Sequence, residues 1–581
     1  MMTDNKNLIL AIVLSIAIVL GFELLYNKPR GDQQRALQAD RATRDTPTQV
    51  TPAAPGETVP GIPATGVAPT APSRPVPMAE QPRVRIEAPD MAGSILLQGG
   101  RIDDLKLTKY RETVDPNSPP IALLTPQGAP NAYFAEFGWV AATQGVALPG
   151  PSTVWTADRP VLTATEPVTL SWDNGQGLRF ERTIALDGEY MFKVTQRVTN
   201  TGGAPVQLHP YGLVARTGTP HTQGYYILHE GPIGVLGGSL HEPNYDDVKS
   251  AQKLEFQTTG GWLGITDKYW LTALVPGNDS EAKARFYHTA DNGTDRFQAD
   301  YLGGATTVAP GESATTTHHF FAGAKELKLL EHYRDALGID RFDLAIDFGY
   351  LWFLTEPIFK ILNFFYKLLG NYGLAILLLT VLIKALFFPL ANKSYRAMAK
   401  MKLLQPEMEK LRERYGEDRA RLSQEMMSLY KRAGANPLAG CLPIVIQIPV
   451  FFALYKVLFI SIEMRHAPFY GWIHDLSAPD PTSVFNLFGL LPWAPPELHL
   501  LSATIGAWPL IMGLTMFLQQ KLNPQPPDPV QARIFMVMPV IFTVILAPFA
   551  AGLVIYWAWN NTLSVLQQWI IMRRMNAKPL T

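Results

Sequence analysis

Long apolar stretches constrain this chain more than any other feature of its sequence. The first runs from Asn7 to Tyr26, and the others follow one another closely toward the C-terminus. These further stretches are Tyr372–Leu390, Leu438–Ile462, Leu501–Leu522, Ile534–Phe549 and Gly552–Met572. A helix needs about 20 apolar residues to cross a bilayer, and most of the stretches approach that length. The sequence therefore predicts a polytopic α-helical membrane protein with six spans.

The composition agrees with a membrane protein. Only 17% of the 581 residues are charged, whereas about 25% is usual for soluble domains. The 50 Lys and Arg balance 50 Asp and Glu, so we expect no direct nucleic-acid recognition. The single cysteine, Cys441, excludes an internal disulfide and a cysteine-cluster metal site. We expect neither a metal nor a cofactor.

The orientation follows from the segment 391–434, which is dense in basic side chains. Its Lys and Arg residues are Lys393, Arg396, Lys400, Lys402, Lys410, Arg412, Arg414, Arg419, Arg421, Lys431 and Arg432. Short loops rich in Lys and Arg stay in the cytoplasm. The loop 523–533, the tail 573–581 and the N-terminus are then also cytoplasmic, whereas the loop 463–500 and the long segment between the first two spans lie outside.

That long outer segment divides into three parts. Residues 28–82 are rich in Pro, Ala and Thr, which predicts a disordered tether. Residues 84–322 contain short alternating runs such as VTLSW and MFKVTQRV, the pattern of a large antiparallel β-sandwich. Residues 325–369 read as helices, and the second of these, Tyr350–Leu369, carries a stripe of polar residues. We expect this helix to lie in the membrane interface, although an ordinary amphipathic helix packed on protein is the alternative.

The basic segment 391–434 carries a heptad pattern as well. Its apolar positions are Met401, Leu404, Met408, Leu411 and Tyr415, followed by Leu422, Met426, Leu429 and Ala433. Two such helices joined by the turn at Gly416 predict a coiled hairpin in the cytoplasm. Its seam and basic outer face suggest a surface for a partner, although a hairpin without a partner would show the same pattern.

Motifs for catalysis are absent from the sequence. It contains no G-x-x-x-x-G-K-[ST], G-x-S-x-G or H-E-x-x-H pattern, so we expect no enzyme and no nucleotide-driven motor. His209, His221, His229, His241 and Glu230 of the outer domain could form a sugar site, which would suit a tethered carbohydrate-active enzyme. Scattered surface histidines are the more ordinary interpretation.

The spans carry polar residues at one common level. Lys384 lies six residues before the cytoplasmic end of its span, which places it about 9 Å deep. The other polar positions are Gln447, Thr515, Thr543, Asn560, Asn561, Ser564, Gln567 and Gln568, and all fall in the inner halves of their spans. Lys456 is the exception and lies near an outer end. The shared depth of Lys384 and the inner polar residues predicts a hydrated cavity open to the cytoplasm. Snorkelling of Lys384 and ordinary interhelical hydrogen bonds could also explain these residues.

Residues 372–574 resemble the YidC/Oxa/Alb family of membrane protein insertases. The resemblance rests on PLANKSYRAMAKMKLLQPEMEKLRERYG, SQEMMSLYK, NPLAGCLPIVIQIPVFFALY, APFYGWIHDLSAPDP and MPVIFTVILAPFAAGLVIYW. The N-terminal anchor and the outer β-domain are similar to the Gram-negative bacterial form of that family. The resemblance thus extends over nearly the whole chain and is weakest in the tether.

The resemblance implies a five-helix core around a hydrophilic substrate groove, a functional cytoplasmic hairpin and a periplasmic β-supersandwich similar to galactose-mutarotase folds. It maps the groove cation to Lys384, with Gln447 and the region from Asn560 to Ser564 beside it. Thr380 and Trp557 match positions of the core. Ile448, Phe451, Phe542 and Ile545 match a slide along which substrate helices leave. Lys384 stands where the family usually has Arg, which removes bidentate carboxylate binding, and Trp557 stands where a tyrosine is common.

The function implied by the resemblance is insertion and folding of proteins in the bacterial inner membrane, alone or with the Sec translocon. The partners it implies are nascent membrane proteins, the Sec translocon and SecDF complex, ribosomes and membrane lipids. A solute transporter or channel is the alternative from another class. It would need a path to both sides, and the outer halves of the spans are mostly apolar.

Overall fold

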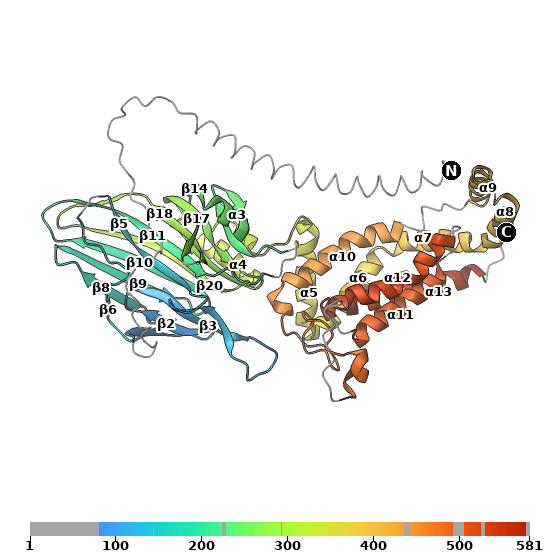
Figure 1. The fold of residues 1–581 in the computed structure, drawn as a ribbon, viewed down its shortest axis with the longest axis horizontal. Coiled ribbons are helices and arrows are strands. Elements are labelled where there is room, and N and C mark those ends of the chain that lie inside the picture. Colours follow the sequence, from blue (N-terminus) through green and yellow to red (C-terminus); the bar gives the residue numbers. More distant parts are fainter. Residues whose placement is uncertain are drawn as a thin grey trace, which may run out of the picture.

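The computed structural model describes residues 81–142, 145–222, 228–291, 293–416, 418–434, 442–491, 505–523 and 529–576. The expected anchor at Asn7–Tyr26 and nearly all of the expected tether lie outside the described residues. Figure 1 shows the β-strands gathered at one end of the molecule and the long helices at the other.

Residues 83–324 form two large sheets. Their strands are β1 (Arg83–Glu87), β2 (Met91–Leu96), β3 (Arg101–Arg111), β4 (Pro120–Leu124), β5 (Tyr133–Ala141), β6 (Thr156–Ala157), β7 (Val161–Thr163), β8 (Val168–Asp173), β9 (Leu178–Leu186), β10 (Met191–Asn200), β11 (Val206–Thr217), β12 (Gly231–Leu236), β13 (Ser239–His241), β14 (Lys253–Thr259), β15 (Trp262–Thr266), β16 (Trp270–Val275), β17 (Glu281–Asp291), β18 (Thr294–Gly303), β19 (Thr306–Val308) and β20 (Ser313–Ala324). One short helix, α3 (Tyr245–Ala251), lies among them.

The first sheet has the order β14-β17-β18-β11-β5-β3-β2-β1-β7, with β19 beside β11 and β4 beside β3. The second has the order β13-β12-β15-β16-β20-β10-β9-β8-β6. Neighbouring strands are antiparallel, for example β9 and β10 with Ile184 opposite Val194, whereas β1 and β7 are parallel. The alternating runs of the sequence therefore form a β-sandwich, as predicted.

The core of the sandwich comes from the inward residues of both sheets. Along β9, buried positions alternate with more exposed ones, which is the period of a strand with one face on the core. The rings of Phe137 and Phe320, from different sheets, meet edge to face with centroids 6.1 Å apart. Phe192 packs on Phe320 at 5.8 Å. The first contact joins the two sheets and the second lies within one sheet, and apolar burial stabilises both.

Helices occupy the rest of the described chain. They are α4 (Leu327–Leu337), α5 (Trp352–Leu369), α6 (Tyr372–Leu386), α7 (Phe388–Leu403), α8 (Gln405–Tyr415), α9 (Arg419–Arg432), α10 (Leu442–Ile460), α11 (Ala507–Leu522), α12 (Pro529–Leu546) and α13 (Ala551–Asn576), with the 3-10 turns η3 (Phe342–Ala345), η5 (Ile462–Met464) and η6 (Val484–Gly489). Within the described parts of the chain, no single helix is long and apolar enough to cross a bilayer alone, although α6 and α7 meet that criterion as a pair bent by 70°.

Proline explains where two expected helices break. The expected span Tyr372–Leu390 ends as a helix at Leu386, and α7 begins one residue before Pro389. The ring of Pro389 clashes with a carbonyl one turn earlier and has no N–H to donate. Pro406 acts in the same way, so the expected first hairpin helix is divided between α7 and α8.

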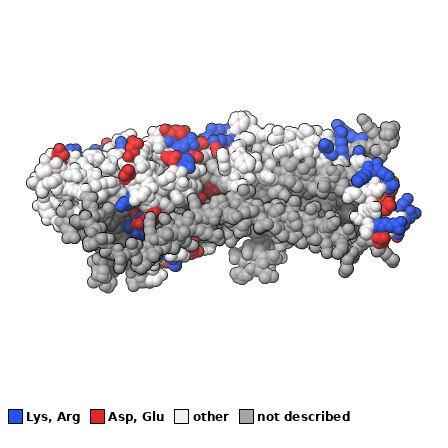
Figure 2. Space-filling view, turned by 90° about the horizontal axis from the view of Figure 1, so that it is seen from above, with Lys and Arg blue, Asp and Glu red and all other residues white. Residues whose placement is uncertain are grey.

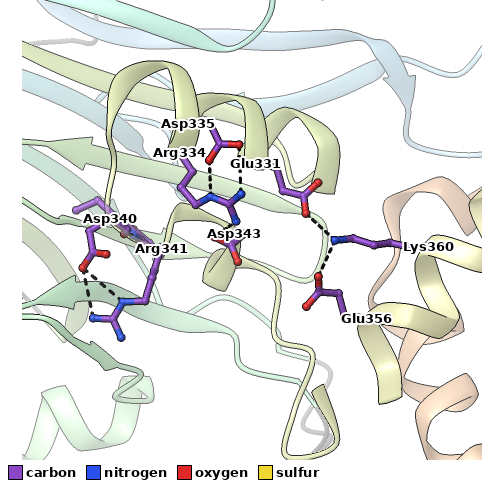
Figure 3. Close-up of polar contacts among 9 residues, drawn as sticks. Glu331, Arg334, Asp335, Asp340, Arg341, Asp343, Glu356 and Lys360 are labelled. Atoms are coloured by element: carbon purple, nitrogen blue, oxygen red, sulfur yellow. Dashed lines mark hydrogen bonds and ion pairs between the residues drawn. The ribbon is translucent and has the colours of Figure 1, made fainter. Parts of the chain in front are cut away.

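Ion pairs join neighbouring parts of the helical region, and a hydrogen bond joins that region to the β-domain. Lys360 of α5 pairs with Glu356 at 2.7 Å and with Glu331 of α4 at 3.0 Å (Figure 3). Lys456 of α10 pairs with Asp347, which precedes α5, at 2.7 Å. Arg465 donates through Nη2 to the carbonyl of Arg111 in β3 at 2.6 Å. The two parts of the molecule are thus connected by contacts between side chains as well as by the chain itself.

Candidate substrate groove

The cation of the predicted groove has a defined hydrogen-bond partner. Lys384 of α6 donates through Nζ to Oγ of Ser564 on α13 at 2.8 Å. The Ser564 hydroxyl donates in turn to the carbonyl of Asn560 at 2.8 Å. No ion pair joins Lys384 to a carboxylate among the described residues, so this ammonium is held by neutral groups.

A second polar contact crosses the helices nearby. Gln447 of α10 donates through Nε2 to the hydroxyl of Tyr556 on α13 at 2.5 Å. Tyr556 is almost fully buried. Sequence reasoning missed Tyr556, because it lies among apolar residues and its hydroxyl gives no periodic signal. Trp557 stands where the family commonly has a tyrosine, so a hydroxyl is lost at that position. Tyr556 supplies a hydroxyl one residue earlier.

Two of the predicted groove threonines bond within their own helices. Thr543 donates to the carbonyl of Pro539 at 2.8 Å, and Thr515 donates to that of Met512 at 2.8 Å. Asn561 reaches Thr515 through a longer contact of 3.5 Å. Thr380 donates to the carbonyl of Ile376 at 2.7 Å and is buried. The three threonines thus bond to carbonyls of their own helices, and Asn561 reaches across to α11.

Several buried polar atoms on α13 have no hydrogen-bond partner within the described structure. They are Nε1 of Trp559, Oδ1 of Asn560, Nε2 of Gln567 and Oε1 of Gln568. Buried polar groups are nearly always paired with protein or water. Asn560, Gln567 and Gln568 lie three or four residues from Ser564 along α13 and share its face of the helix. This face therefore offers donors and acceptors that water or a polar segment of another chain could satisfy.

The predicted slide residues separate into a cluster and a surface. The ring of Trp557 lies 4.6 Å from that of Phe451 and 6.0 Å from that of Phe542. Ile448 and Ile545, by contrast, are exposed. The structure thus brings the three aromatic residues together from α10, α12 and α13, and it leaves an apolar surface beside them.

The predicted hairpin is formed by α8, α9 and the end of α7. Met408, Leu429 and Tyr430 make a small buried cluster, and Met401, Leu404, Leu411 and Met426 pack against it. Leu422 is half buried near the turn. Figure 2 shows Lys and Arg gathered at the end of the molecule that Figure 1 assigns to these helices.

The histidines of the β-domain have individual structural partners. His209 bonds to the carbonyl of Gly303 at 3.0 Å, His229 bonds to that of Pro232 at 2.9 Å, and His241 packs on the ring of Phe256. Among the described residues, no group of three or more His, Cys, Asp or Glu side chains is arranged to hold a metal ion. These three contacts therefore agree with the interpretation of His209, His229 and His241 as scattered histidines with separate structural roles.

Ionisable groups are buried where the helices meet the β-domain. Burial raises the pKa of Glu463, which follows α10, to about 7, and Ser461 donates a hydrogen bond to it at 2.8 Å. Burial lowers the pKa of Lys268, whose ammonium lies 3.8 Å from the ring centre of Phe459, to about 8. Burial favours the neutral form of each group, so the stability of the junction depends on pH.

In this structure a β-sandwich is joined to helices, and Lys384 lies among polar groups of those helices. This is the arrangement expected of a helical membrane protein with a domain outside the bilayer. Comparisons with known proteins make the class specific. Residues 83–361 match the family model for the YidC periplasmic domain, and residues 364–578 match that for the 60Kd inner membrane protein.

Similar curated proteins span the whole chain. "Membrane protein insertase YidC" of Nitrobacter hamburgensis is 53% identical over 592 residues, covering 100% of this chain and 96% of that protein. The proteins of the same name from Bradyrhizobium diazoefficiens and Methylobacterium nodulans are each 52% identical, covering 100% and 99% of this chain and 97% and 96% of those proteins. The chain belongs to the YidC family of membrane protein insertases, which are inner-membrane proteins and not enzymes.

Two solved structures are similar over part or most of the chain. The first is a crystal structure of an active YidC insertase with its first transmembrane domain resolved. The alignment includes 84% of this chain and 94% of that chain, with 16% identity and a TM-score of 0.34. A galactose mutarotase-like protein from Lactobacillus casei covers 41% of this chain and 99% of that one, with 10% identity and a TM-score of 0.28.

Proposed function

We propose that this insertase moves short segments of new membrane proteins into the bilayer through a groove that contains Lys384. The observation that carries the proposal is the position of this ammonium, held by Ser564 next to unpaired polar atoms of α13. A polar or acidic tail of a substrate loses water when it enters a membrane, and this loss is its main cost. A cation and hydrogen-bonding groups inside the groove reduce that cost.

The driving force comes from the apolar part of the substrate. Once its tail occupies the groove, the apolar segment moves along the aromatic cluster of Phe451, Phe542 and Trp557 toward lipid. Burial of apolar surface in lipid contributes about 25 cal/mol per Å², so no nucleotide is required. The exposed side chains of Ile448 and Ile545 lie beside this path and suit contact with a departing helix.

Six spans, with both termini in the cytoplasm and the β-domain in the periplasm, are the topology that this mechanism needs. Three features support it: the apolar stretches, the basic hairpin and a charge-poor band over the helices in Figure 2. The exposed aromatic face of α5, with Trp352, Phe353 and Phe364, suits an interfacial helix. Cysteines at Val154 and Met427, which are exposed on the β-domain and on α9, should react with impermeant maleimide from opposite sides of intact inner-membrane vesicles.

Nascent membrane proteins are the substrates, and the Sec translocon, the SecDF complex, ribosomes and lipids are the proposed partners. The basic surface of the hairpin supports contact with ribosomes or anionic lipid, because both are negatively charged. The hairpin also lies at the end where the groove would open.

Photo-crosslinking during insertion tests the proposal. A photoreactive phenylalanine analogue at Phe451 should crosslink to the apolar segment of a stalled single-span substrate. The same analogue at Phe364, which is exposed on α5, is the matched control and should not. Equal crosslinking at both positions would show that the substrate contacts the protein without following the slide.

A further inference from the structure

Residues 468–491, between η5 and α11, form an irregular loop with an unusual surface. Its exposed side chains include Tyr470, Trp472, Phe485, Leu487, Phe488 and Leu490, and Leu490 is 82% exposed. The loop contains no Lys, Arg or Glu, and its two Asp residues are not exposed. An irregular loop in water usually has the opposite composition on its surface.

The two carboxylates of this loop are turned inward. Asp475 accepts hydrogen bonds from the backbone N–H and the hydroxyl of Ser477, both at 2.7 Å. Asp480 is 3% exposed and accepts from Trp472 Nε1 at 3.1 Å and from the backbone N–H of Trp508 at 2.8 Å. The polar side chains therefore serve the interior of the loop, and its apolar side chains form the surface.

Several backbone groups of the loop form hydrogen bonds within it. The N–H of Phe469 donates to the carbonyl of Ile473 at 2.9 Å, that of Phe488 donates to Ser483 at 2.7 Å, and that of Leu491 donates to Asn486 at 3.0 Å. Irregular backbone is tolerated at membrane depth only where such groups are paired within the protein. The segment meets that condition at these three positions.

Contacts place the loop at the N-terminal ends of two helices. Asn371, which caps α6, donates through Nδ2 to the carbonyl of Pro468 at 3.3 Å. The N–H of Ala507, the first residue of α11, donates to Oγ1 of Thr482 at 2.9 Å. The 16 residues of α11 extend about 24 Å, whereas the hydrocarbon core is about 30 Å thick. The loop therefore lies where α11 leaves part of the outer leaflet unfilled.

We propose that residues 468–491 are immersed in the outer leaflet of the membrane, with lipid chains around Leu487, Phe488 and Leu490. Tyr470 and Trp472 carry polar atoms on large rings, which suits the headgroup level. Leu487 and Phe488 have φ of 51° and 59°, a left-handed conformation that is uncommon outside glycine. This conformation belongs to a turn that exposes both side chains together. The proposal rests on the placement of the helices in a bilayer. The experiment below tests that placement and the immersion of the loop separately.

Depth-dependent fluorescence quenching tests this immersion. In the full chain with Cys441→Ser, single substitutions Leu490→Cys, Leu514→Cys and Val154→Cys would be labelled with a polarity-sensitive dye. Each protein would be reconstituted in phosphatidylethanolamine–phosphatidylglycerol vesicles with spin labels at a shallow or a deep acyl position. Leu514 is exposed on α11 and reports the bilayer, and Val154 is exposed on the β-domain and reports water.

We expect a blue-shifted dye at Leu490 that is quenched more by the shallow spin label, together with quenching at Leu514 and none at Val154. Water-like emission at Leu490 with quenching at Leu514 would overturn the immersion alone. A blue-shifted dye at Leu490 that no spin label quenches would assign the surface to a protein partner and would also overturn it. Loss of quenching at Leu514 would contradict the placement of the helices, and with it the basis of the proposal.

Discussion

Lys384 and Ser564 lie 180 residues apart in the sequence, and the Lys384 ammonium donates to the Ser564 hydroxyl at 2.8 Å. This contact fixes the groove cation between α6 and α13. Because the Ser564 hydroxyl also donates to the carbonyl of Asn560 at 2.8 Å, it connects the cation to the backbone of α13. A change at Ser564 should therefore affect both the packing of these helices and the position of the charge.

Replacement of Ser564 tests that relationship. Ser564→Ala removes a hydrogen bond to a charged group, which is typically worth about 1.5–3 kcal/mol, so the free energy of unfolding in detergent should fall by about that amount and insertion should decrease. Ser564→Thr keeps the hydroxyl and should retain most of both. If the alanine and threonine variants behaved alike, the hydroxyl would have no role in holding Lys384.

The pair of Lys456 and Asp347 should stabilise the junction between α10 and the segment before α5. Its side chains are 11% and 23% exposed, and removal of one member of a buried pair typically costs about 3–5 kcal/mol. Because Asp347 is partly exposed, we expect the lower end of that range for Asp347→Ala in thermal unfolding. The double variant Asp347→Ala, Lys456→Met should regain part of the loss. An additive loss would show that the two side chains do not interact.

Asp480 should stabilise the start of α11 from a distance of 28 residues in the chain. Loss of an N-terminal capping side chain typically costs about 0.5–2 kcal/mol, and Asp480→Ala should lower the free energy of unfolding by at least that amount. Asp480→Asn retains a side-chain acceptor and is the matched control. Hydrogen exchange at the first turn of α11 should increase in the alanine variant, and unchanged exchange would argue against a capping role.

Glu463 should make stability depend on pH. Burial raises its pKa in the folded protein to about 7 from the ordinary value of 4.5, so the folded state favours the protonated form. Its contribution is fully present below pH 4.5 and is lost as the pH rises through 7. Glu463→Gln stays neutral and should lose less stability than the wild type between pH 5 and pH 8 in thermal unfolding. If the stability of both proteins changed with pH in parallel, Glu463 would not be the cause of the pH dependence.

The sequence predicted the large features of the fold because they depend on local patterns. The alternating runs of residues 84–322 form strands with one buried face, such as β9, and apolar positions of the hairpin pack in one small cluster. The aromatic cluster of Phe451, Phe542 and Trp557 and the position of Lys384 came from the resemblance and from the common depth of the polar residues. The number of membrane crossings remains a prediction.

Other features were beyond the sequence because they depend on contacts between distant segments. No pattern joins Lys456 to Asp347 or Gln447 to Tyr556, since each pair comes from different elements. Depth alone could not show that Thr515 and Thr543 bond to their own helices and not into a groove. The inward carboxylates of residues 468–491 were missed for the same reason, because their partners are backbone groups.

The most direct test of the account is insertion of a single-span protein with an acidic outer tail into vesicles that contain only this purified insertase. Protection of the tail from protease would be compared for the wild type, for Lys384→Glu and for Lys106→Glu, the same charge reversal at an exposed position of β3. We predict equal insertion by the wild type and Lys106→Glu, and an insertion rate at least about tenfold lower for Lys384→Glu, which corresponds to about 1.4 kcal/mol. Insertion by Lys384→Glu at the wild-type rate would contradict a mechanism in which this cation receives the substrate.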